Sequence, residues 1–161
     1  MTGEHPDILS RLAENEEAIG VLYQAYAKRY PDYSSFWSGL AHEEEEHACW
    51  IRALCSIASE TGLVIKQRRF NEAALQTYCN YLGRELANVK QGDTTLLNAL
   101  AATLYIEESM IERKYFDVFE ADAPELKRVL LRLAEATKVH VDRARETLEN
   151  YRRAASSHPS F

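Results

Sequence analysis

An all-α domain, a four-helix bundle with a long crossover, is the fold that the amino-acid sequence predicts. Apolar residues recur at the three- and four-residue spacing of helices over four long stretches. The chain contains only 6 Gly and 4 Pro, with no Pro between Pro31 and Pro124, so it lacks the turn signals of an all-β fold. Its 161 residues are 46% hydrophobic, which is enough for one core, so we expect a single domain over residues 1–161.

The first two bundle helices are expected to be antiparallel neighbours, because the link between them is short. Helical periodicity starts at Ile8 and stops at Tyr30-Pro31-Asp32. The second run starts after Ser34-Ser35, which can cap a helix, and ends at Gly62.

Residues 62–93 are expected to form the crossover, which is long enough to travel the length of the bundle. The stretch Leu63 to Phe70 suits an extended connector. A shorter helix is expected from Asn71 to about Lys90, with Leu75, Tyr78, Leu82, Leu86 and Val89 facing inward.

The second half of the bundle is expected to begin at Asp93-Thr94-Thr95, which can cap a third long helix with apolar residues as far as Val118. Pro124 suits the first turn of a fourth helix that runs to about Tyr151. The core bundle would then cover about residues 8–152, and the segment 153–161, which has no periodicity, is expected to be frayed.

Charged residues interrupt the apolar rows of the first two helices, although charges at core positions are costly unless paired or bound to a metal. In the first helix Glu16 lies in the row Leu12, Ile19, Tyr23, Tyr26. In the second, the pair Glu44 and His47 lies in the row Trp37, Leu40, Ile51, Leu54, Ala58. Residues three apart reach one ion from adjacent turns, whereas Glu43, Glu45 and Glu46 are expected on solvated faces.

The other two helices also carry polar residues on their apolar rows. In the third, periodicity admits either Glu107, in a row with Leu97, Leu100 and Leu104, or Glu108. In the fourth, His140 with Thr137 three before it lies in the row Leu126, Leu130, Leu133, Ala144, Leu148. Carboxylates and imidazoles from four helices form a ligand set suited to iron, manganese or zinc rather than calcium.

Several local patterns together resemble rubrerythrin-like proteins of the ferritin superfamily, over roughly residues 8–150. They are Glu16 with Tyr23 seven later, Leu-Ala-His-Glu-Glu-Glu-Glu-His at 40–47, Ile-Glu-Glu-Ser at 106–109, and His140. The resemblance implies two irons that react with peroxide or dioxygen, and a homodimer. It also implies the metal ligands Glu16, Glu44, His47, Glu107 and His140.

The fourth helix departs from the family pattern, because Thr137 stands where the family has Glu before His140. Glu108 is the expected substitute, and the site is expected to hold two metals, one or none. The leading expectation is a non-haem iron oxidoreductase acting on peroxide or dioxygen. The alternatives are a catalytically degenerate bundle with a binding or structural role, and iron storage or delivery.

Simpler readings of the polar residues are an arginine partner for Glu16, such as Arg52 or Arg113, and a hydrogen bond from His140 to a carbonyl or to Tyr23. His42 is expected at the surface. The three cysteines, Cys49, Cys55 and Cys79, match no zinc-site spacing and are expected to be reduced, buried thiols.

Composition argues against two classes of partner. The net charge of -6 and the pI near 5.4 disfavour nucleic acid, which needs clustered positive charge. The sequence contains neither a basic and apolar leader nor a run of roughly 20 apolar residues that would span a bilayer. We therefore expect a soluble, cytoplasmic protein with no membrane partner.

Overall fold

The computed structural model describes residues 5–61, 66–67, 72–112, 119–120 and 124–157. This part of the chain contains five α-helices: α1 (His5–Arg29), α2 (Ser34–Thr61), α3 (Glu72–Gln91), α4 (Leu96–Glu112) and α5 (Pro124–Ser156). A short 3-10 helix, η1 (Pro31–Tyr33), joins α1 to α2. Strands β1 (Lys66–Gln67) and β2 (Phe119–Glu120) pair antiparallel, with Lys66 opposite Glu120. The all-α prediction is confirmed.

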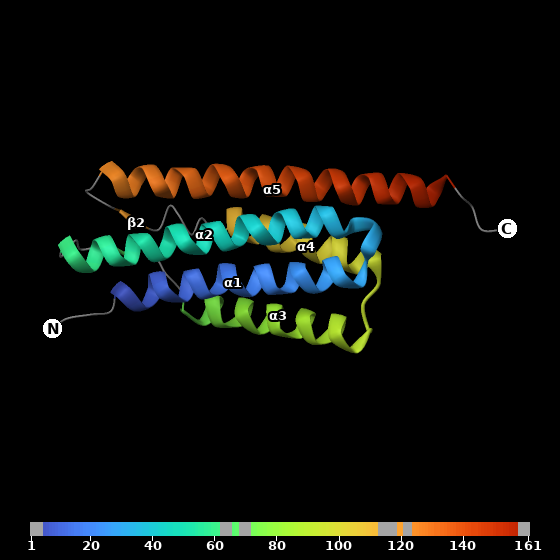
Figure 1. Cartoon of the computed structure of the whole chain (residues 1–161), viewed down its shortest axis with the longest axis horizontal. Coiled ribbons are helices and arrows are strands. Elements are labelled where there is room, and N and C mark those ends of the chain that lie inside the picture. The colour runs from blue at the N-terminus through green and yellow to red at the C-terminus, as the bar shows by residue number, and fades with distance from the viewer. Residues whose placement is uncertain (1–4, 62–65, 68–71, 113–118, 121–123, 158–161) are drawn as a thin grey trace.

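The helices form two antiparallel pairs and one connecting helix (Figure 1). α1 packs along α2, and α4 packs along α5. α3 packs against α1 and carries the chain back along the length of the molecule, so that α2 and α4 run in the same direction. The predicted crossover helix is therefore present, and it contributes buried side chains, among them Leu75, Tyr78 and Leu82, to the core.

Local sequence explains where three of these helices begin or end. Pro31 stops α1, because a proline cannot donate the next helical hydrogen bond. Gly92 ends α3 in the left-handed conformation, with φ of 79°, and Asp93 N–H donates to the Asn88 carbonyl at 2.9 Å. Thr95 caps α4, since its hydroxyl accepts a hydrogen bond from the Asn98 N–H at 3.2 Å.

The core forms where the apolar rows of the helices meet. Its largest fully buried side chains include Trp37, Tyr23, Tyr26, Tyr78, Ile19, Leu22, Leu40, Ile51, Leu75, Leu100, Ile106 and Leu133. The indole N–H of Trp37 on α2 donates to the Thr103 hydroxyl on α4 at 2.9 Å, and Thr103 donates in turn to the Ala99 carbonyl. This contact fixes which face of α4 points inward. Leu97 was predicted on the inward row, but its neighbour Leu96 packs against the core and Leu97 itself is 40% exposed.

Other predicted boundaries and environments need correction. α5 continues to Ser156 instead of ending near Tyr151, so residues 153–156 of the expected frayed tail are helical. α4 ends at Glu112, and Val118 lies outside the described residues.

The cysteines are free, but none is buried: Cys49 is exposed, and Cys55 and Cys79 are partly exposed. Among the described helices, none combines the length and hydropathy needed to cross a membrane.

Candidate metal centre

The five predicted ligands all lie in the interior. Glu16 comes from α1, Glu44 and His47 from α2, Glu107 from α4 and His140 from α5, and none exposes more than 4% of its surface. Because each residue belongs to the inward row of its helix, the same periodicity that buries the leucines also buries these polar groups. The predicted burial is confirmed for Glu16, Glu44, His47 and His140, and of the two alternatives on α4 it is Glu107 that is buried.

Glu44 is the centre of the cluster, because it contacts both histidines. Its Oε1 is 2.9 Å from Nδ1 of His140, and its Oε2 is 3.1 Å from Nδ1 of His47. The two imidazole rings stack with centroids 5.2 Å apart. One potential ligand atom from each of the three residues lies within 4.8 Å of the others, a spacing that suits a shared metal ion.

Glu107 and Glu16 complete the inner set of carboxylates. The Tyr23 hydroxyl donates to Oε1 of Glu107 at 2.6 Å, and Oε2 of Glu107 is 3.5 Å from Nδ1 of His140. Glu16 shares a hydrogen bond with Glu44. α4 therefore turns Glu107 into the interior. The expected substitute Glu108 has a side chain that is 41% exposed and lies 3.1 Å from Nη2 of Arg145, so it does not belong to the cluster.

The alternatives to a metal-ligand role were an arginine partner for Glu16 and a hydrogen bond from His140 to a carbonyl or to Tyr23. Nη2 of Arg52 lies 2.8 Å from Oε1 of Glu17, so Arg52 pairs with Glu17. Arg113 lies outside the described residues. The phenol of Tyr23 contacts Glu107 rather than His140. His42 is at the surface as expected, 3.8 Å from Glu46.

Burial and mutual contact divide the carboxyl groups into two classes. Burial, together with the charge of Glu44, raises the pKa of Glu16 and the pKa of Glu107. Burial also acts to raise the pKa of Glu44, but hydrogen bonds with His140, His47 and Glu16 outweigh it and hold this pKa far below its usual value. Glu44 is thus the ionised carboxylate of the inner cluster.

His140 takes the opposite charge. Burial alone would lower its pKa, but hydrogen bonds with Glu107 and Glu44 raise the pKa of this imidazole to about 10. The metal-free cluster is therefore an imidazolium enclosed by carboxyl groups. A divalent cation could replace its protons, and binding would release them. The donor set fits such an ion, because it offers carboxylate oxygen and imidazole nitrogen.

Sequence reasoning missed Glu43, which was expected on a solvated face. Its Oε2 lies 2.5 Å from Nε2 of His140, and both of its oxygens accept hydrogen bonds from Nη1 of Arg143, at 2.9 and 2.7 Å. Burial opposes ionisation of this carboxyl, but hydrogen bonds from Arg143 lower its pKa. The signal was present in the spacing, since Glu43 lies four residues before His47 and so borders the inward face.

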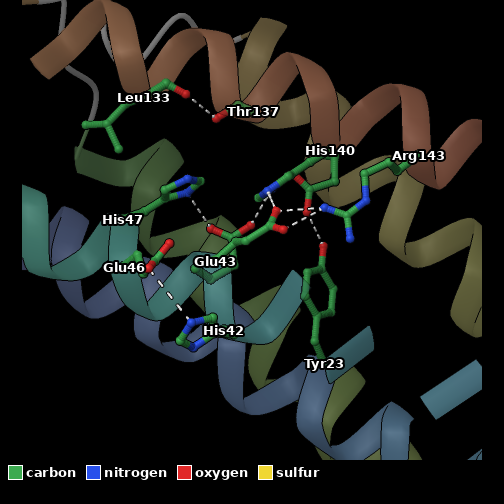
Figure 2. A network of polar contacts seen from close by, with 11 residues as sticks. Tyr23, His42, Glu43, Glu46, His47, Leu133, Thr137, His140 and Arg143 are labelled. Atoms are coloured by element: carbon green, nitrogen blue, oxygen red, sulfur yellow. Dashed lines mark hydrogen bonds and ion pairs between the residues drawn. The ribbon is translucent and has the colours of Figure 1, made fainter. Parts of the chain in front are cut away.

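Thr137 is buried beside the cluster but contributes no contact to it among the described residues. Its hydroxyl donates to the Leu133 carbonyl at 2.9 Å, one turn back along α5 (Figure 2). The fourth-helix position that the family resemblance assigns to a carboxylate is therefore occupied by a side chain that bonds to its own helix.

Two surface hollows, of about 770 and 350 Å³, lie elsewhere. The larger is lined mainly by residues of α1 and α3, and neither includes any of the five predicted ligands.

Compared with protein-family models, with curated proteins and with solved structures, the chain gives no match.

Proposed function

We propose that this protein is a ferritin-like, rubrerythrin-like bundle whose buried centre binds iron and acts as an oxidoreductase on peroxide or dioxygen, with manganese or zinc as alternative metals. The convergence of Glu44, His47 and His140 on one point inside the molecule carries the proposal. The order of the helices supports it, since two hairpins joined by a long crossover are the connectivity of ferritin-like bundles.

The side chains have distinct roles in this proposal. Glu44 would hold the metal between the two histidines, which would each present a neutral nitrogen. Glu16 and Glu107 would supply further oxygens, and Tyr23 would keep Glu107 oriented. Bound ferrous iron would supply one electron to the oxidant as it becomes ferric, and a separate one-electron reductant would supply the second electron and restore the ferrous ion. The enclosed position of the cluster favours reactants as small as peroxide or dioxygen over a bulky substrate.

A second candidate function is metal binding in a structural bundle without redox turnover. Thr137 favours it, because its hydroxyl bonds to the Leu133 carbonyl where the family pattern has a carboxylate. Iron storage, a third candidate function, needs a closed shell of many subunits. We propose a homodimer, and light scattering of the purified protein would distinguish the two.

Elemental analysis of protein purified without chelator tests metal binding directly. We expect at least about one equivalent of iron, manganese or zinc per chain, lost in the double variant Glu44→Ala/His47→Ala. The matched control is Glu45→Ala/His42→Ala, which changes the same residue types at exposed positions of the same helix and should keep the metal. Full occupancy in the first double variant would refute the site.

Redox activity needs a separate measurement. Anaerobic protein loaded with ferrous ion should be oxidised by peroxide faster than free ferrous ion at the same concentration. Stopped-flow absorbance follows both reactions. Equal rates would remove the oxidoreductase proposal and leave the binding function.

A further inference from the structure

A basic side chain lies at the outer edge of the metal centre. Arg143 is three residues after His140 on α5, so both side chains leave the helix on the same side. Its Nη1 donates to both oxygens of Glu43, and Glu43 in turn contacts Nε2 of His140 (Figure 2). The guanidinium is thus joined to a predicted ligand through one carboxylate. Both Arg143 and Glu43 are only about one third exposed, with side-chain values of 36% and 37%.

The facing helix leaves room for this guanidinium. Gly39 lies on α2 one turn before Glu43, and a Cβ at this position would come within 3.3 Å of Nη2 of Arg143. Glycine inside a helix costs about 1 kcal/mol relative to alanine. Because Gly39 has no Cβ, Arg143 reaches Glu43 without being displaced.

Among the described residues, the donors that remain are too few for a second ion. A first ion can use Glu44, His47 and His140, with Glu16 and Glu107 close by. On the Nε2 side of His140, the nearest carboxylate is Glu43, whose two oxygens already accept hydrogen bonds from Arg143. Thr137 turns its hydroxyl away from this side. Zinc sites in proteins use at least three protein ligands, and among the described residues this side offers two, Glu43 and Nε2 of His140.

We infer that the centre holds a single divalent metal ion and that Arg143 occupies the place and the positive charge of a second one. The inference rests on the proposed function, because it presupposes that the first ion binds. Glu43 then acts as a positioning residue that holds His140 from outside, as carboxylates commonly do behind metal-binding histidines.

Titration of chelator-treated protein with Co²⁺, followed by equilibrium dialysis and visible absorption, tests the stoichiometry. Wild-type protein should saturate at about one Co²⁺ per chain. Arg143→Glu removes the cation and adds a carboxylate beside Glu43 and Nε2 of His140, so saturation should rise twofold, to about two. Arg145→Glu is the matched control: it makes the same charge change on the same helix, where Arg145 faces Glu108, and should stay at about one.

Each outcome bears on the inference. Wild-type protein that binds two ions overturns it and leaves the proposed function intact, whereas wild-type protein that binds none overturns both. An Arg143→Glu variant that stays at one ion, or an Arg145→Glu control that also binds two, shows that Arg143 does not occupy a cation position. If circular dichroism shows that Arg143→Glu is unfolded, Arg143→Gln frees Glu43 with a smaller change. A second, weaker Co²⁺ is expected in that variant, and its absence would overturn the inference.

Discussion

The hydroxyl of Tyr23 on α1 donates a 2.6 Å hydrogen bond to Glu107 on α4, across the interior of the molecule. The two residues are 84 positions apart in the chain. The bond joins the first hairpin to the second at the level of the candidate centre. It also gives the buried carboxyl group a donor that it could not obtain from water.

Replacement of Tyr23 by Phe should therefore destabilise the metal-free protein. The ring still fills its space, but Glu107 loses one of its hydrogen-bond donors in a buried site, which costs about 1–3 kcal/mol of unfolding free energy. Urea unfolding measures the loss. Tyr105→Phe is the control, because Tyr105 is 50% exposed, and it should change stability by less than about 0.5 kcal/mol. Equal stability of the two variants would contradict the prediction.

The two adjacent glutamates of α4 should differ in their effect on metal binding. Glu107→Gln removes a buried carboxylate next to His140 and should weaken Co²⁺ affinity by at least about tenfold. Glu108→Gln alters a partly exposed ion pair with Arg145 and should leave the affinity unchanged. Isothermal titration calorimetry compares the two, and a stronger effect of Glu108→Gln would mean that α4 presents its other face.

The metal-free protein should lose stability as the pH rises from 7 to 10. The pKa of His140 is raised to about 10 in the folded state, against about 6.5 for an unperturbed histidine. A group with a raised folded pKa stabilises the fold fully below its unfolded pKa, and this stabilisation disappears as the pH passes the folded value. Unfolding midpoints in urea at several pH values should fall in the wild type. In His140→Gln the fall in unfolding free energy over this pH range should be smaller, and parallel curves would argue against a buried imidazolium.

The core of α5 can be probed with two leucines close in sequence. Leu133 is fully buried one turn before Thr137, so Leu133→Ala should reduce the unfolding free energy by about 2–5 kcal/mol. Leu131 is 64% exposed, and Leu131→Ala should cost less than about 0.5 kcal/mol. Thermal or urea unfolding distinguishes the variants, and similar losses would show that α5 is rotated relative to the described packing.

Periodicity within single helices was enough to find most of the buried polar residues. Glu16, Glu44, His47 and His140 lie on apolar rows whose spacing leaves one inward face, and all four are buried. The choice between Glu107 and Glu108 stayed open, because adjacent helical positions differ by only 100° of rotation. What decides it is a contact between helices, in which Trp37 of α2 bonds to Thr103 of α4.

The residues that sequence reasoning misplaced depend on partners far away in the chain. Glu43 belongs to a run of four glutamates, and it turns towards the centre because His140 and Arg143, about a hundred positions later, bind it. Spacing inside α2 places Glu43 at the border of the inward face, but it does not identify these distant partners. The last turns of α5, up to Ser156, were missed because their exposed residues have no apolar period.

The crossover through α3 divides the candidate ligands between two parts of the chain. Glu16, Glu44 and His47 precede it, whereas Glu107 and His140 follow it. An ion held by both groups would fasten the two hairpins together, since binding to the assembled form alone draws the equilibrium towards assembly. A molecule cut between α2 and α3 should consequently stay in one piece while its metal is present and come apart when a chelator removes it.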